Sequence, residues 1–219
     1  MNANDFLKTL SQPNQYTKKD EVFSKLQLVG NKFNKIDLQS FILNDATLLN
    51  LCFNDSNLSG ASFNNCLIKG VDYKNSEMPG QLNKCVFINC TFDSYSYLFL
   101  SCRECEFIEC TFGRIEKMNI DASSSKFIKC EFYQVNIINS HLRNNLFLST
   151  NFLESTFSNT PFQHNRFFEN NFYKVKLKNP NSFLAIFYKN RYDRCAGFEK
   201  ELLELESTEH YFEFGATVN

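Results

Sequence analysis

A bulky apolar residue returns at every fifth position from Leu28 to Leu177. A period of five fits neither the 3.6-residue period of an α-helix nor the two-residue period of a β-strand. It is typical of a solenoid, in which each short unit packs on its neighbours. One four-residue step divides the pattern into two registers, and Lys117 is the only member without an apolar side chain. The first register is Leu28, Phe33, Leu38, Leu43, Leu48, Phe53, Leu58, Phe63, Ile68, Tyr73 and Met78, and the second begins Leu82, Phe87, Phe92, Tyr97 and Cys102.

A second, smaller residue stands two positions before each bulky one, and a mostly polar residue separates the two. Examples are Ser56, Ala61, Cys66, Val71, Cys85, Cys90, Cys105, Cys110, Cys130, Thr150, Ser155 and Thr160. Residues 28–178 therefore resemble the pentapeptide-repeat family, whose motif is roughly Ala-(Asp/Asn)-Leu-x-x. The resemblance implies an all-β solenoid, a right-handed quadrilateral β-helix with four pentapeptides per coil, about 7–8 coils and both motif positions pointing inward.

A coil of four pentapeptides predicts that residues 20 positions apart stack on one another. One column would be Phe87, Phe107, Phe127, Phe147 and Phe167, and the next Phe92, Phe112, Phe132, Phe152 and Phe172. Counting back across the four-residue step extends the second column through Tyr73, Phe53 and Phe33. Met78-Pro79-Gly80 would absorb the missing residue as a local turn, and Lys117 predicts a distorted corner. A ladder of Asn119, Asn139, Asn159 and Asn179 is interpreted as structural, because asparagine tolerates left-handed turns.

The flanking segments lack the repeat, which predicts three parts: a lead-in over 1–27, the β-helix over 28–178 and a C-terminal module over 179–219. Asn179-Pro180-Asn181-Ser182 is a typical helix start. The expected helices would carry Phe183, Leu184, Ile186 and Phe187, then Leu202, Leu203 and Leu205 after Gly197. Such a module would either cover the open end of the solenoid or form a homodimer, and the sequence leaves both open.

Composition favours a protein without cofactor, metal or membrane span. No apolar run approaches the length of a membrane helix and no secretory signal is evident, so a cytoplasmic protein is expected. Six of the nine cysteines, at positions 66, 85, 90, 105, 110 and 130, occupy the small inward position. Because their Cβ vectors would be parallel and ~4.8 Å apart, we expect reduced, buried thiols rather than disulfides.

Catalysis finds little support in the sequence. The three histidines lie far apart, and no phosphate loop or zinc-ligand cluster is present. The outward residue after each bulky one is apolar along one side, where a polar residue is expected. This candidate interaction stripe is Ile88, Ile108, Ile128, Leu148 and Phe168, with Val29 and Leu49 further along and Lys69 interrupting. Another segment of the chain, a second copy or a foreign protein could cover it.

The quinolone- and toxin-resistance members of the family are dimeric bacterial rods that protect DNA gyrase or topoisomerase IV, with a negative surface likened to duplex DNA. The resemblance therefore implies a topoisomerase-binding protein. Residues 28–177 hold 14 acids and 14 bases, however, and a neutral rod is a poor mimic of a polyanion and a poor nucleic-acid binder. The alternative is a general interaction scaffold, such as a regulatory adaptor or effector module. A clustered acidic face would favour the first hypothesis and an open apolar stripe the second.

Overall fold

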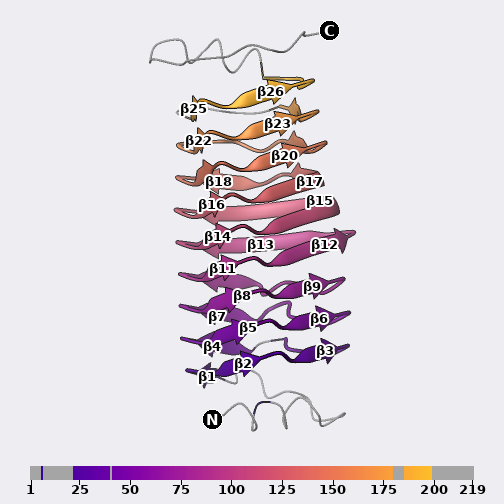
Figure 1. Cartoon of the computed structure of the whole chain (residues 1–219), viewed down its shortest axis with the longest axis vertical. Helices are drawn as coiled ribbons and strands as arrows, with labels where there is room; N and C mark the ends of the chain where they lie inside the picture. The colour runs from indigo at the N-terminus through magenta and orange to yellow at the C-terminus, as the bar shows by residue number, and fades with distance from the viewer. Residues whose placement is uncertain (1–5, 7–21, 40, 180–184, 199–219) are drawn as a thin grey trace.

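Short parallel strands stack into a four-sided rod in the computed structural model, which describes Phe6 and residues 22–39, 41–179 and 185–198 (Figure 1). Each strand pairs with the strand one coil further along the chain, 20 residues away in most of the rod. Every rung is thereby hydrogen-bonded to the rungs on either side, as a solenoid requires. The prediction of an all-β solenoid is confirmed.

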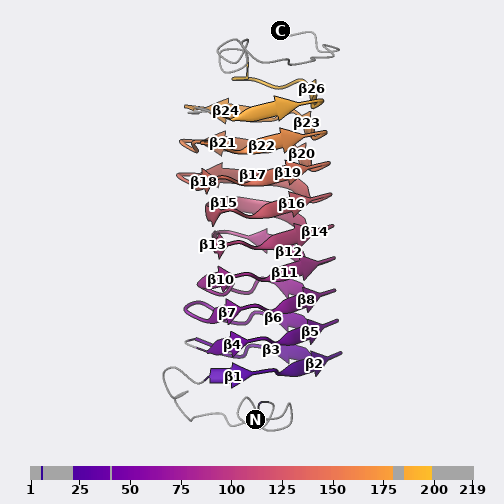
Figure 2. The ribbon, with the colours of Figure 1, turned by 90° about the vertical axis from the view of Figure 1, so that its left-hand side faces the viewer.

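Sheet B forms one side of the rod, which we call side 1; sides 2, 3 and 4 follow in chain order. It is a column of nine strands, so the first and last are eight coils apart, roughly 38 Å at ~4.8 Å per rung (Figure 2). Its strands are β2 (Gln27–Val29), β5 (Thr47–Leu49), β8 (Leu67–Lys69), β11 (Val86–Ile88), β14 (Glu106–Ile108), β16 (Lys126–Ile128), β19 (Leu146–Leu148), β22 (Arg166–Phe168) and β25 (Ile186–Tyr188).

Sheet A, with 17 strands, makes up the other three sides. Its shorter strands are β1 (Val22–Ser24), β3 (Lys32–Asn34), β4 (Ile42–Asn44), β6 (Cys52–Asn54), β7 (Ser62–Asn64), β9 (Asp72–Lys74), β10 (Gln81–Asn83), β18 (His141–Arg143), β20 (Asn151–Leu153), β21 (Thr156–Ser158), β23 (Asn171–Tyr173), β24 (Lys176–Lys178) and β26 (Arg191–Asp193). Longer strands occupy the middle of the rod: β12 (Thr91–Tyr95), β13 (Leu98–Arg103), β15 (Thr111–Ser123) and β17 (Glu131–Ile138).

The core consists of side chains stacked along the rod axis. Phe107, Phe127 and Phe147 lie in one column with successive ring centroids 4.9 and 4.8 Å apart. The column of side 2 is the longer one and is aromatic throughout: Phe33, Phe53, Tyr73, Phe92, Phe112, Phe132, Phe152, Phe172 and Tyr192. Parallel rings at this spacing bury their faces against each other, so both predicted aromatic columns are confirmed.

The four-residue step is absorbed as predicted. Leu82 pairs with Phe63 and Phe92 with Tyr73, each 19 residues apart rather than 20, and the columns continue without a break. The asparagine ladder is also confirmed as structural. Asn139, Asn159 and Asn179 take positive φ values of 45°, 49° and 48° at a corner, and the Asn159 amide donates to Asn139 Oδ1 at 3.2 Å.

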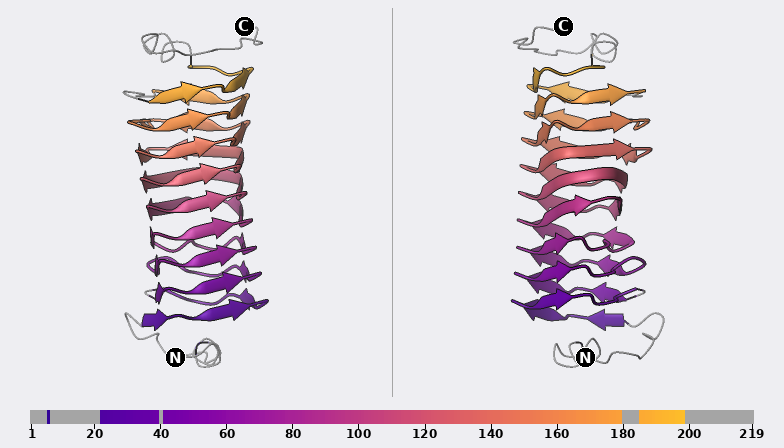
Figure 3. Two further views of the ribbon diagram at one scale, coloured as in Figure 1. Left: turned by 60° about the vertical axis from the view of Figure 1, so that its left-hand side comes forward. Right: turned by 90° about the vertical axis from the view of Figure 1, so that its right-hand side faces the viewer.

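Side 3 departs from the five-residue rule in the middle of the rod. Tyr97, predicted to point inward, is 56% exposed, whereas Tyr95, Leu98 and Leu100 are buried. In β13 and β15 the chain follows the two-residue alternation of a continuous strand and turns the corner as one ribbon (Figure 3). Lys117 also points outward, because Met118 beside it takes the inward position. The register between β15 and β17 shifts between Ile115 and Met118, and this is the distortion that Lys117 predicted.

The prediction of a helix after residue 179 is wrong for the residues that the structure describes there, 185–198. Ile186 and Phe187 lie in β25, which pairs with β22, and Phe187 continues the aromatic column of side 1 at 4.7 Å from Phe167. Ala185 and Phe187 fill the small and the bulky inward positions of a further pentapeptide. Pairing of this segment with an existing rung outweighs the local preference for a helix start. Phe183, Leu184, Leu202, Leu203 and Leu205 lie outside the described residues.

Single aromatic residues pack on the two ends of the core. Phe198 contacts Phe172 and Tyr192 edge-on, with centroids 5.3 and 5.1 Å away. At the other end, Phe6 contacts Phe23 and Phe41 in the same way, at 5.0 and 6.0 Å. Phe198 thereby lies against Tyr192, the last ring in the column of side 2, and Phe6 lies against Phe23 of the first strand, β1. Among the described residues no helix is long and apolar enough to cross a membrane.

Candidate protein-binding surfaces

The outward side of sheet B carries an almost unbroken apolar row. The row consists of the residue that follows each buried one, and the backbone register aligns its members in order: Val29, Leu49, Lys69, Ile88, Ile108, Ile128, Leu148, Phe168 and Tyr188. The five residues of the predicted stripe are therefore neighbours in space. Tyr188 extends it by one rung, with its ring 6.2 Å from that of Phe168.

A second outward position on the same strands adds to the apolar surface. Leu67 is 38% and Ile186 45% exposed, and Val86 and Leu146 are half-buried. We call the combined surface the apolar face: Val29, Leu49, Leu67, Val86, Ile88, Ile108, Ile128, Leu146, Leu148, Phe168, Ile186 and Tyr188. The flat, parallel strands hold these side chains in two straight rows. No described segment of the chain crosses them.

Charge on this side is sparse. Lys126 Nζ lies 2.6 Å from Glu106 Oε1, which pairs two of the charges on sheet B with each other. Lys69 and Arg166 are the other charged residues on its strands. Contiguous apolar surface of this kind makes sheet B a candidate protein-binding surface.

Ion pairs between neighbouring rungs join opposite charges at several places on the rest of the rod. Glu154 and Lys174, one coil apart, pair at 2.8 Å, and this contact lowers the pKa of Glu154 below its usual value. Asp93 and Arg114 form a second such pair, and Arg114 likewise lowers the pKa of Asp93. The further pairs are Lys84 with Glu104 at 3.8 Å and Lys129 with Glu109 at 3.9 Å. No side of the described rod gathers acidic residues alone.

The cysteines of the small inward position are buried and free. Their thiols donate to carbonyl groups, as Cys130 Sγ does to Phe107 O at 3.3 Å. Burial raises the pKa of Cys102 to about 12, and hydrogen bonding with Cys130 together with burial raises that of Cys110 to about 12. Such thiols are poor nucleophiles at neutral pH. The described residues contain no group of three or more His, Cys, Asp or Glu arranged to hold a metal ion.

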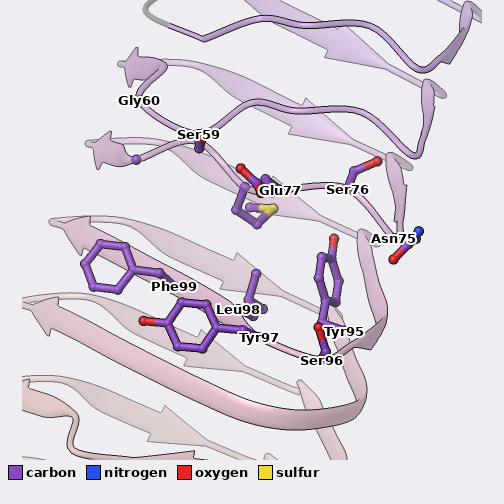
Figure 4. Close-up of a pocket in the computed structure, with 12 residues that line it drawn as sticks. Ser59, Gly60, Asn75, Ser76, Glu77, Tyr95, Ser96, Tyr97, Leu98 and Phe99 are labelled. Carbon is purple, nitrogen blue, oxygen red and sulfur yellow. The ribbon is translucent and has the colours of Figure 1, made fainter.

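A pocket of about 450 Å³ opens on side 3, opposite sheet B (Figure 4). Ser59, Glu77 and Tyr97 line it from three successive rungs, and Phe99 lies beside Tyr97. Tyr97 is 56% and Phe99 41% exposed. Sequence reasoning missed this site because it assigned Tyr97 to the core. The run of apolar residues Tyr97-Leu98-Phe99-Leu100 was the available signal, since it does not fit the spacing of the five-residue repeat.

Comparison with known proteins gives similar folds at low identity. No protein-family model and no curated protein matches the sequence. A trypsin-treated variant of QnrB1, a plasmid-mediated fluoroquinolone resistance protein, superimposes with a TM-score of 0.47 and 16% identity, covering 88% of this chain and 100% of that one. HetL from the cyanobacterium Nostoc sp. strain PCC 7120, a pentapeptide repeat protein involved in heterocyst differentiation regulation, gives 0.45 and 12%, covering 87% and 94%.

The assignment of this chain follows from its own geometry. Five residues make one side, four sides make a coil, and two positions of each pentapeptide point into a core of stacked side chains. These features make the described part of the chain a four-sided parallel β-solenoid whose structural unit is five residues long.

Proposed function

We propose that this chain is a non-enzymatic rod that binds a partner protein through the apolar face of sheet B. The observation that carries the proposal is the row from Ile88 to Tyr188, aligned by the backbone register and left uncovered by the described residues. Burying such a row contributes roughly 25 cal/mol for each Å² of apolar surface removed from water. The buried free thiols suit a reducing compartment, so the proposal includes a cytoplasmic location.

Photo-crosslinking tests this proposal on the intact protein. Ile128 is replaced by p-benzoylphenylalanine, and in a matched control Asn64, half-buried on side 4, is replaced in the same way. Illumination in cells that produce the protein natively should give a discrete adduct from position 128 and none from position 64. An adduct with the chain itself would identify a homodimer, and one with another protein would identify that partner. Equal labelling from both positions, or none from position 128, would refute a binding role for the apolar face.

A narrower form of the proposal is that this chain protects a topoisomerase. The resemblance of its five-residue repeat to the pentapeptide-repeat family supports this form. The alternation of Glu154 with Lys174 and of Asp93 with Arg114 supports the scaffold form instead, because neighbouring opposite charges cancel the field of a polyanion mimic. A gyrase supercoiling assay with a fluoroquinolone separates the two. Restored supercoiling with the wild-type protein, lost in Ile128→Asp, would establish topoisomerase protection through the apolar face. No rescue would leave the general scaffold.

A further inference from the structure

On side 3 the ladder of backbone pairs is interrupted between two neighbouring rungs. Asp37, Asn57 and Glu77 pair in succession, one coil apart, but no pair joins Glu77 to the next rung. There, Leu98–Ser101 of β13 pair only with β15, on the far side. Contact with the preceding rung resumes at Cys102, which pairs with Leu82. Part of β13 therefore presents a free strand edge inside the rod.

The chain itself accounts for the gap. Pro79 follows Glu77 and Met78 and has no backbone N–H to donate to a neighbouring strand. Gly80 then passes close to Gly60, where an added Cβ would stand 3.0 Å from the Gly60 nitrogen. The one-residue shortening thus draws residues 78–80 toward the preceding coil and away from β13. A free edge of this kind accepts an added strand.

The side chains around the gap form a recess of definite character. Tyr97, the residue before β13, and Phe99, within it, have large exposed areas and lie on the opposite wall from Glu77 (Figure 4). Glu77 is the single charged residue that lines the pocket, and its carboxylate has no ion pair among the described residues. Glu104, Glu106 and Glu154, by contrast, each have a basic partner.

We propose that this pocket binds an extended peptide segment of a partner protein, with a basic side chain of the peptide lying on Tyr97 and Phe99 and pairing with Glu77. The free edge of β13 supplies backbone hydrogen bonds to the peptide, as in strand addition to a sheet edge. The aromatic rings attract a cation through their faces, and the carboxylate accepts charge-assisted hydrogen bonds from it. Only a single extended segment can occupy an edge that has a complete coil on either side.

The test uses the full chain and a synthetic library of seven-residue peptides. The central residue is arginine, the flanking positions vary among Val, Thr, Ser and Tyr, and a matched library carries citrulline, which has the same shape without the charge. Affinity selection should enrich arginine peptides over citrulline peptides. The best peptide should bind Glu77→Gln about tenfold or more weakly than the wild type. N-methylation of its backbone on the edge facing β13 should abolish binding.

Two protein variants serve as controls. Phe99→Ala should weaken binding, whereas Tyr133→Ala, which removes an exposed ring from side 2, should leave it unchanged. Ile108→Lys in the apolar face should also leave it unchanged, so failure of this pocket and failure of the apolar face give different results. The proposal is overturned if no peptide is enriched, if arginine and citrulline peptides bind equally, or if Glu77→Gln binds as the wild type does while retaining its fold.

Discussion

Phe112 and Phe132 lie one coil apart with ring centroids 4.7 Å apart and planes only 9° from parallel. Phe92 stacks on the other face of Phe112 at the same 4.7 Å. Each ring is completely buried, so both of its faces contribute to the core. The stability of the rod therefore depends on continuous columns, in which every side chain supports the coils on either side.

Phe112→Ala should lower the free energy of unfolding by about 3–5 kcal/mol, because it removes a buried ring and leaves a cavity between two others. Asn64→Ala, on the outside of the rod, loses a hydrogen bond to Asn44 and should cost about 1 kcal/mol. Urea unfolding followed by circular dichroism measures both. Similar values for the two variants would contradict the stacked-column description of the core.

Asn170→Leu should destabilise the rod although the two side chains are similar in size. The buried Asn170 accepts a hydrogen bond from Thr150 N at 2.8 Å and donates one to Phe147 O at 3.0 Å. Leucine satisfies neither backbone group, at a cost of roughly 1–3 kcal/mol for each. The exposed Asn151→Leu is the matched control and should unfold close to the wild-type urea midpoint. An unchanged urea midpoint for Asn170→Leu would show that the hydrogen bonds of Asn170 make no net contribution to stability.

Tyr73→Phe should stabilise the protein. The Tyr73 ring stacks between Phe53 and Phe92, but its buried hydroxyl has no partner among the described residues. Phenylalanine keeps the ring and removes a polar group whose burial costs roughly 1–3 kcal/mol. Thermal unfolding should show a higher midpoint for Tyr73→Phe. A lower midpoint would mean that the hydroxyl does have a partner, such as a buried water.

Stability should fall at alkaline pH because of the buried thiols. Burial raises the pKa of Cys102 from 9.0 to about 12, so between these values only the unfolded chain loses the proton. The resulting loss is about 1.4 kcal/mol per pH unit for this group, and it is absent below pH 9. Cys102→Ala should flatten the profile by that slope. Alanine already occupies this inward position one coil on, at Ala122, so the variant should fold. If the stability of the wild type and of Cys102→Ala fell with the same slope above pH 9, the raised pKa of Cys102 would be refuted as the cause.

Gly197→Ala should loosen the last coil selectively. Gly197 has a φ of +87°, and an added Cβ would overlap the Leu177 carbonyl. Gly30, at a φ of +71°, has open space at its Cβ position, so Gly30→Ala costs only backbone strain of about 1 kcal/mol. Hydrogen exchange should speed up for β25 and β26 in Gly197→Ala and stay unchanged in β14 and β16. Equal protection of β25 in the two variants would contradict the clash.

The buried asparagines illustrate what the five-residue pattern left out. Asn145, Asn165, Asn170 and Asn190 occupy the small inward position, which the repeat marks as a place for Ala, Ser or Cys. They fit because each amide bonds to backbone groups of neighbouring rungs, as Asn165 does with Leu142 O at 2.8 Å. The five-residue period reflects only the size and polarity of side chains. It does not reveal hydrogen-bond partners that belong to other coils.

The sequence by itself determined the columns and the apolar row, because its five-residue repeat, with the four units per coil that the family resemblance implies, brings residues 20 positions apart into contact. Local pattern cannot decide where one rung fails to pair with the next. The inward turn of Leu98, the exposure of Tyr97 and the strand at Ile186–Tyr188 all depend on pairing with chain one coil away. Only the tertiary structure therefore revealed the pocket beside Glu77, because its walls come from successive rungs and it opens where backbone pairing between the rungs of Glu77 and Tyr97 is missing.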